Sequence, residues 1–208
     1  KIPIFVGGTG LYFKALIEGL VKIPNIPIKF RNKIRKDHKN IGQKKFYNKL
    51  VKLDPLIKNK IKLTDAQRSI RAYEVKLFTK KSIFEWFKET NSKYPYDAFY
   101  KIYIDHPRPE LVKKISDRVN KMIKSGVIEE VKKFLKLKVK HDKTSNKVIG
   151  IKEIVDFIEK KSNSLDLNEK ISIKTRQYAK RQATWARGQM LDWQKIKPND
   201  LDKFLKKI

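Results

Sequence analysis

A glycine-rich segment near the start of the chain has residue types suited to anion binding. Gly7-Gly8-Thr9-Gly10 follows the apolar run of residues 2–6, IPIFV, and precedes apolar residues at helical spacing. This order predicts a buried parallel strand that enters a tight turn and then a helix. Backbone N–H groups at such a junction point outward and can bind an anion. Many turns of this kind serve packing alone, so the segment by itself leaves both interpretations open.

A second segment, near the end of the chain, combines cations with an aromatic ring. Residues 175–187, TRQYAKRQATWAR, are predicted to lie on one helix, where side chains three or four positions apart share a face. A basic stripe beside an aromatic side chain suits neutralisation of phosphates together with stacking on bases. An amphipathic helix whose long cations reach into solvent is the alternative. The predicted stripe consists of Arg176, Lys180, Thr184 and Arg187, with Arg181 and Trp185 next to it.

Residues 67–71, QRSIR, form a shorter basic segment. Gln67, Arg68 and Arg71 would lie within about one helical turn. Arginine is scarce relative to lysine in this chain, and its planar guanidinium can form two parallel hydrogen bonds to one anion. The segment therefore predicts a second phosphate-binding face, with a solvated basic surface as the alternative.

The composition favours a folded protein with a polyanionic partner. Hydrophobic residues make up 40% of the 208 residues and aromatic residues 11%, which is enough for a packed core. The 51 Lys and Arg against 22 Asp and Glu give a net charge of +29, which favours nucleic acid or an anionic membrane as a partner. Cysteine is absent, and His38, His106 and His141 lie far apart, which argues against disulfides and a zinc site.

The hydropathy pattern argues against a membrane protein. The longest stretch without a charge, residues 2–13, is too short to span a bilayer. No signal peptide is recognisable in the sequence. We therefore expect a soluble, cytoplasmic monomer without a membrane partner.

The sequence between the two chemically suggestive segments is predicted to be mainly helical. Residues 29–92 have no strand pattern, and they contain capping boxes at Thr64 with Gln67 and at Ser82 with Glu85. A second strand is predicted at residues 99–104 and a short one near Trp193. Further helices are predicted at residues 109–125, 127–137, 151–160 and 167–189, the last of them capped by Asp166 and Glu169.

This pattern predicts an α/β fold in which a helical insertion interrupts a parallel-sheet core. We assign residues 1–28 and 93–208 to the core and residues 29–92 to an all-helical insertion domain. A parallel strand needs neighbouring strands, and the chain offers few candidates. We therefore expect the chain to be a fragment whose sheet is completed by a segment before Lys1.

Two segments of the chain resemble the tRNA dimethylallyltransferases, which prenylate an adenosine beside the anticodon. They are IPIFVGGTGLYFKALIEGL near the start and KRQATWARGQ near the end, and the second matches the signature KRQxTWxR at all of its fixed positions. The resemblance extends from Lys1 to about Trp193. It implies an incomplete P-loop NTPase-like core, the cofactor Mg²⁺, and dimethylallyl diphosphate and a tRNA anticodon stem-loop as partners.

The resemblance also implies roles for individual residues. Thr9 would be catalytic, and Arg118, within ISDRV, would bind the diphosphate. Residues 147–152, KVIGIK, stand where the family has a pattern close to RxVGYR, so two bidentate arginines are replaced by lysines. The residues expected to contact tRNA are Arg31, Gln67, Arg68, Ser69, Ile70, Arg71, Lys147, Lys152, Arg176, Lys180, Arg181, Gln182, Thr184, Trp185 and Arg187.

One family motif is absent from the 208 residues. No GxxxxGK followed by Ser or Thr occurs, and the aspartate that the family uses as general base belongs to the same region. We therefore expect the chain by itself to be inactive. The alternatives are a non-enzymatic RNA-binding protein derived from the family and an adenylate dimethylallyltransferase acting on free nucleotides. The latter would need neither the helical insertion nor the KRQxTWxR helix.

Overall fold

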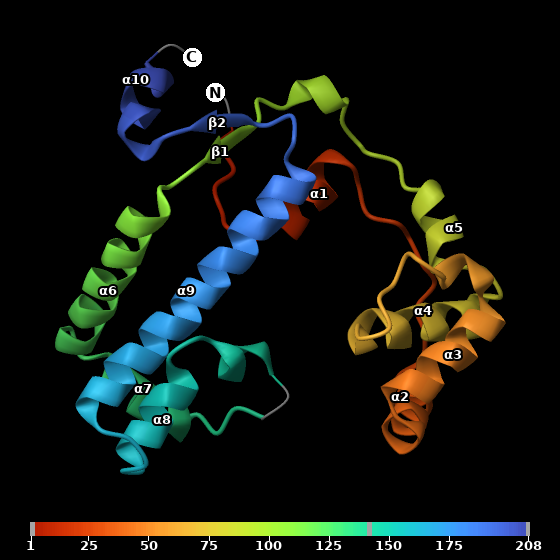
Figure 1. Ribbon diagram of the computed structural model, residues 1–208, viewed down its shortest axis with the longest axis horizontal. Coiled ribbons are helices and arrows are strands. Elements are labelled where there is room, and N and C mark those ends of the chain that lie inside the picture. Colours follow the sequence, from red (N-terminus) through yellow and green to blue (C-terminus); the bar gives the residue numbers. More distant parts are fainter. Residues whose placement is uncertain (1–2, 141–142, 207–208) are drawn as a thin grey trace. The chain divides into compact units, whose positions relative to one another are not determined.

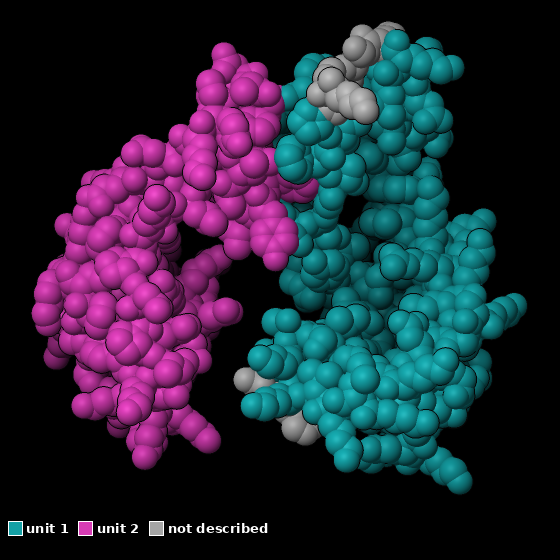
Figure 2. All heavy atoms as spheres, turned by 180° about the vertical axis from the view of Figure 1, so that it is seen from behind, with its two compact units in different colours: residues 1–10, 100–208 teal, residues 11–99 magenta. Residues whose placement is uncertain are grey.

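The chain divides into two compact units in the computed structural model, which describes residues 3–140 and 143–206. The helical unit comprises residues 11–99, and the core unit comprises residues 1–10 with 100–208 (Figure 2). Each unit has its own buried apolar cluster. The domain boundaries expected from the sequence, after residue 28 and after residue 92, stay a prediction.

The helical unit is built from short helices around one apolar cluster. Its core contains Phe46, Leu50 and Ile57, each without solvent exposure, and the ring of Phe46 lies 4.9 Å from that of Tyr73. No residue from 29 to 92 forms a strand, as the sequence predicts. The elements are α1 (Gly10–Ile17), which starts one residue before the unit, α2 (Ile28–Ile41), α3 (Gln43–Leu53), α4 (Ala66–Thr79) and α5 (Ile83–Lys88), with short 3₁₀ turns at Pro55–Ile57 and Tyr96–Ala98.

The start of α5 follows the sequence prediction, whereas the start of α4 does not. The Glu85 carboxylate accepts a hydrogen bond from the Ser82 N–H at 2.6 Å, which is half of the predicted capping box. At α4, Asp65 takes the capping position, and its carboxylate accepts from the Arg68 N–H at 3.0 Å. The predicted box of Thr64 with Gln67 is therefore wrong, because a carboxylate directly before the helix satisfies the first N–H groups and the helix dipole together.

The core unit contains a small parallel sheet flanked by helices. Strands β1 (Ile102–Ile104) and β2 (Gln194–Ile196) pair in parallel, with Ile102 opposite Gln194 and Ile104 opposite Ile196. Both strands lie where the sequence predicts them. The helices are α6 (Arg108–Lys124), α7 (Val127–Lys136), α8 (Ile151–Ile158), α9 (Ser164–Gln189) and α10 (Leu201–Leu205), with 3₁₀ turns at Thr144–Lys147 and Pro198–Asp200.

The long helix α9 packs against α6 and α8 (Figure 1). Its first half carries Leu167 and Ile171 into a cluster that also contains Ile115, Val119 and Ile154. Helix α9 begins at Ser164, so its N-cap is Asn163, whose amide oxygen accepts from the Asp166 N–H at 2.8 Å. The predicted cap by Asp166 and Glu169 is wrong because the helix starts before them.

The predicted strand at residues 2–6 is not formed in the described part of the chain. Residues 3–6 have no regular secondary structure, and the side chains of Ile4 and Val6 are 78% and 91% exposed. A strand requires backbone partners from a neighbouring strand. Strands β1 and β2 pair with each other, and the described residues offer no third strand to residues 3–6.

A buried carboxylate fixes the loop that precedes α8. Glu153 is almost fully buried, accepts from the Gly150 N–H at 2.9 Å and pairs with Lys174 of α9. Burial acts to raise the pKa of Glu153, but the bond to Lys174 and those to the backbone N–H groups outweigh it, so its pKa is lowered. Glu153 thereby joins α8, α9 and the loop of residues 147–150.

We expect Glu153→Gln to destabilise the chain at neutral pH. The loss should be about 1.5–3 kcal/mol, typical of hydrogen bonds to a charged group. A lowered pKa means that the charged form stabilises the fold above the ordinary value of 4.5 and that this contribution disappears as the pH falls below it. Urea denaturation of the 208-residue chain at pH 7 and below pH 4 measures both effects.

Glu159→Gln is the matched control for this experiment, because Glu159 pairs with Lys161 on the surface. Such exposed pairs contribute at most about 1 kcal/mol. A difference between wild type and Glu153→Gln that stays constant with pH would contradict the assigned role of the Glu153 charge.

Candidate active site

The turn of residues 7–10 packs directly on the C-terminal half of α9. The Gln182 side-chain amide donates a hydrogen bond to the Gly8 carbonyl oxygen at 2.8 Å. A Cβ at Gly8 would lie 2.2 Å from that amide nitrogen, and a Cβ at Gly10 would lie 2.0 Å from a ring carbon of Trp185. The Trp185 ring requires glycine at position 10, whereas a side chain at position 8 would displace the end of Gln182 and its hydrogen bond. Two segments more than 170 residues apart in sequence meet through these contacts.

Thr9 lies between these two contacts, directly before α1. Its side chain is exposed, and within the described residues its hydroxyl has no hydrogen-bond partner. The flanking residues are both held by α9, so the backbone of Thr9 is fixed at both ends. A fixed backbone with an unengaged hydroxyl is suited to orienting a substrate group.

A cavity of about 370 Å³ lies along another face of α9. It is formed where β1 ends, α6 begins and α9 passes, with Leu111 and Ile115 among its apolar lining. The carboxyl ends of parallel strands are common positions for ligand sites. The charged side chains that line it are Arg108, Arg176, Lys180, Arg187, Lys195 and Asp105, so cations dominate and the cavity suits an anion with several charges.

Tyr103 and His106 add hydrogen-bonding groups to this cavity. Burial raises the pKa of the Tyr103 hydroxyl, the Asp105 charge raises it further, and Arg187 opposes both. Tyr103 therefore stays protonated near neutral pH and can donate a hydrogen bond. The Nδ1 atom of His106 is buried and has no partner within the described residues.

The residues of the predicted basic stripe do not all lie on one surface. Arg176, Lys180 and Arg187 line the cavity, but Thr184 does not; its hydroxyl oxygen accepts a long 3.5 Å hydrogen bond from Arg187. The guanidinium of Arg181 lies 5.7 Å from the centre of the Tyr178 ring, away from the cavity lining. Gln182 and Trp185 contact the turn of residues 7–10, and the expected contact of both residues with tRNA stays a prediction.

Arg118, expected to bind diphosphate, lies exposed on α6 and does not line the cavity. Sequence reasoning overlooked Arg108 and Lys195, which do line it. A signal was present, because Arg108 follows a strand end and begins a helix, and Lys195 lies on the strand predicted near Trp193. Only the pairing of β1 with β2 places them together.

The predicted RNA-binding residues of the helical unit have different environments. Gln67 and Arg68 are exposed on α4, whereas Ser69 is fully buried and its hydroxyl donates to the Asp65 carbonyl oxygen at 2.7 Å. The Ser69 side chain therefore faces the interior of the unit, and Ile70 packs against its apolar cluster. Arg31 and Arg71 both pair with one buried carboxylate, Glu74.

Lys147 and Lys152 flank the loop that Glu153 fixes, and both are exposed.

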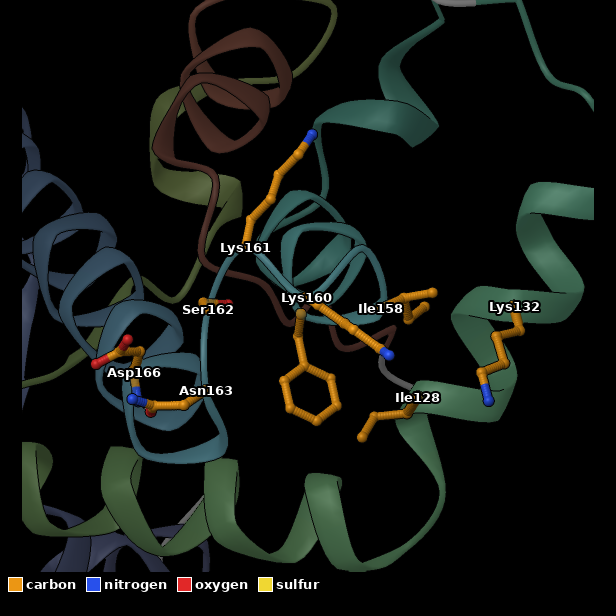
Figure 3. A pocket seen from close by; sticks show the side chains of 9 residues that line it. Ile128, Lys132, Ile158, Lys160, Lys161, Ser162, Asn163 and Asp166 are labelled. Carbon is orange, nitrogen blue, oxygen red and sulfur yellow. The ribbon is translucent and has the colours of Figure 1, made fainter.

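A second, larger cavity lies farther along the core unit, between α7, the end of α8 and the start of α9 (Figure 3). Its lining combines Ile128, Phe157 and Ile158 with Lys132 and Lys160. None of the residues predicted for the site line it.

Within residues 3–140 and 143–206, no three His, Asp or Glu side chains come together as a metal site. No helix in the same residues is long and apolar enough to cross a membrane.

A comparison with known protein families shows to which family this chain is related. Residues 1–189 match the family described as IPP transferase. The chain belongs to the IPP transferase family. The match includes both sides of the site, the turn of residues 7–10 and the cationic part of α9, and the predicted relationship is confirmed.

Named relatives of this IPP transferase chain come from bacteria. A tRNA dimethylallyltransferase of Pelagibacter ubique is 56% identical over 208 residues, which are all of this chain and 66% of that protein. A tRNA dimethylallyltransferase of Rickettsia massiliae is 41% identical over 196 residues, which are 92% of this chain and 53% of the relative. The chain thus spans between about half and two thirds of the length of these relatives.

Solved IPP transferase structures share the fold. A eukaryotic dimethylallyltransferase solved acting on tRNA matches with a TM-score of 0.75 and 28% identity, over 98% of this chain and 53% of that one. The tRNA isopentenylpyrophosphate transferase of Bacillus halodurans matches with a TM-score of 0.52 and 28% identity, over 91% of this chain and 57% of that one. The predicted fold class is confirmed, and the chain is mostly helical with a small parallel sheet.

We expect Gly10→Ala to separate the turn from α9. The added Cβ would overlap the Trp185 ring, and overpacking of this kind costs about 1–3 kcal/mol. Thermal unfolding should therefore occur at a lower temperature, and the tryptophan emission of the folded chain should change.

Gly188→Ala is the matched control, since Gly188 lies in α9 and an added Cβ there meets nothing within 4 Å. This variant should be as stable as wild type or more stable by up to about 1 kcal/mol. Equal stability and emission of wild type and Gly10→Ala would disprove the packing of Trp185 on Gly10.

Proposed function

We propose that the protein containing this chain transfers a dimethylallyl group from dimethylallyl diphosphate to N6 of a tRNA adenosine adjacent to the anticodon. The observation that carries this proposal is the turn of residues 7–10 held on α9, the helix whose other face lines a cationic cavity. Support also comes from membership of the IPP transferase family and from relatives named tRNA dimethylallyltransferase.

The proposed reaction is a displacement at an allylic carbon. The N6 lone pair forms a bond to C1 of the dimethylallyl group, the C1–O bond breaks, and diphosphate leaves with the electron pair. The amine then gives one proton to a general base, which the family resemblance implies is an aspartate of the phosphate-loop region. Because an exocyclic amine is a weak nucleophile, positioning of the two reactants should contribute more than basicity. The target base must also leave its stack, which costs a few kcal/mol.

Thr9 is proposed to orient the leaving diphosphate. Its hydroxyl is exposed on a backbone held at Gly8 and Gly10, so it can donate to an oxygen of the diphosphate without reorganising. The role of Arg118 and the use of Mg²⁺ stay predictions from the family resemblance.

The tRNA anticodon stem-loop is proposed to bind through its phosphates. The exposed cations of α9, the lysines around Gly150 and the arginines of α2 and α4 provide a basic surface in each unit. Neutralisation of phosphates by such groups releases counterions and makes the affinity depend on salt. A cytoplasmic location and a monomeric state remain expectations.

We expect Thr9→Ala to lower kcat about 10- to 1,000-fold in a protein that contains this chain and an intact phosphate loop, because one positioned hydrogen bond is lost at the transition state. The affinity for tRNA should change little. Thr9→Ser retains the hydroxyl and should recover most of the activity. A defect confined to tRNA binding would show that Thr9 is a binding residue.

A second prediction concerns α9, where Arg181→Ala with Arg187→Ala should weaken stem-loop binding to the 208-residue chain. Each lost phosphate contact reduces the slope of log K against log salt by about one, so the double variant should lose about two. Cognate and unrelated stem-loops should be affected alike. Fluorescence anisotropy over a series of salt concentrations measures the slope.

The control for the α9 variant is Lys203→Ala with Lys206→Ala, which removes the same charge from exposed positions in and after α10. Diffuse attraction would give both double variants the same small change in slope. Indistinguishable slopes would therefore exclude α9 as an RNA-binding surface.

A further inference from the structure

The helical unit contains an acidic side chain in an unusual position. Glu74, on α4, is 1% exposed in a chain whose surface is overwhelmingly basic. It lies at the contact between α2 and α4. A buried carboxylate is costly unless cations and hydrogen bonds compensate its charge.

The compensation comes from arginines of both helices. The Nε of Arg31 donates to one carboxylate oxygen at 3.3 Å, and an Nη of Arg71 lies 3.6 Å from the same oxygen. The Nε of Arg35, one turn after Arg31 on α2, lies 3.6 Å from the other oxygen. We name Arg31, Arg35 and Arg71 the arginine triad.

The arginine triad keeps a positive charge after it has paired with Glu74. Its members bring a charge of +3 to a carboxylate of −1, so a net positive charge remains at this point of the surface. Their side chains are still 35%, 51% and 40% exposed, although the carboxylate beneath them is not. Closely spaced guanidinium groups repel one another, and the buried carboxylate offsets that repulsion.

We propose that Glu74 is a positioning residue that presents the arginine triad to RNA phosphates, and that Arg35 is an RNA-binding residue together with Arg31 and Arg71. The inference rests on the proposed function. Arginine loses much side-chain freedom when it binds a phosphate, and a pre-ordered guanidinium avoids part of that cost. The carboxylate holds Arg31 by a hydrogen bond and attracts Arg35 and Arg71 by its charge, so the three guanidinium groups are gathered at one place before RNA arrives.

A purely structural role for Glu74 predicts a different result. In that case the carboxylate only joins α2 to α4, and its removal lowers stability without weakening RNA binding. Glu74→Gln raises the net charge by one, so diffuse electrostatics would then strengthen RNA binding. The positioning role predicts the opposite sign, which makes the direction of the change decisive.

The test is anisotropy titration of the 208-residue chain with a tRNA anticodon stem-loop, at a temperature where circular dichroism shows each variant to be folded. Glu74→Gln should weaken binding by at least about threefold despite its added positive charge. Glu89→Gln is the matched control, because it removes an exposed carboxylate that pairs with Lys81 in the same unit. The control should bind as tightly as wild type or slightly more tightly.

A second pair of variants tests Arg35 while the Glu74 side chain itself is left unchanged. Arg35→Ala should reduce the salt slope by about one. Lys36→Ala, which removes the same charge from the next position of α2, should leave the slope nearly unchanged. If Glu74→Gln does not fold, Glu74→Asp takes its place, since it keeps the charge but withdraws it from the triad and should also weaken binding.

The outcomes separate this inference from the proposed function. Wild type that binds no stem-loop overturns the proposed RNA substrate and the inference with it. Wild type that binds, with Glu74→Gln equal or tighter, overturns the positioning role alone. Equal slopes for Arg35→Ala and Lys36→Ala overturn the assignment of Arg35 to the RNA surface.

Discussion

The contact between the turn of residues 7–10 and α9 is the constraint on which the candidate active site depends. This contact is possible because Gly8 and Gly10 have no side chains. A Cβ at Gly8 would overlap Gln182, and a Cβ at Gly10 would overlap Trp185. Helix α9 can therefore approach the backbone closely enough for Gln182 to bond the Gly8 carbonyl oxygen. Thr9 is fixed between the two contacts, and its side chain is exposed.

Helix α9 serves two purposes along its length. Its first half supplies apolar side chains to the cluster shared with α6 and α8, and its second half supplies the turn contacts and the cations of the cavity. Packing of the first half thus sets the position of the second. A long helix is a rigid means of transmitting that position, because its backbone hydrogen bonds are satisfied internally.

Buried carboxylates organise positive charge in both units. Glu74 gathers arginines from α2 and α4, and Glu153 joins Lys174 to the loop before α8. Both lie next to cations that we assign to RNA binding. In a chain with a net charge of +29, such anions reduce local repulsion while leaving the surface positive. The fold thereby reconciles a surface suited to polyanions with stable packing.

Local patterns in the sequence determined the helices, the strand near residue 102, the Ser82 cap and the segments that carry the chemistry, because these depend on neighbours a few residues away. The sequence could not place Arg108, Lys195 and Arg187 at one cavity, because that arrangement depends on the pairing of β1 with β2. Nor could it place Glu74 beneath three arginines, because that arrangement depends on the packing of α2 on α4. The apolar run at residues 3–6 has the composition of a strand but adopts none in the described structure, because a strand is completed by its partners and not by its own residues. Composition and spacing therefore identified the candidate groups, whereas tertiary contacts decided which of them face one another.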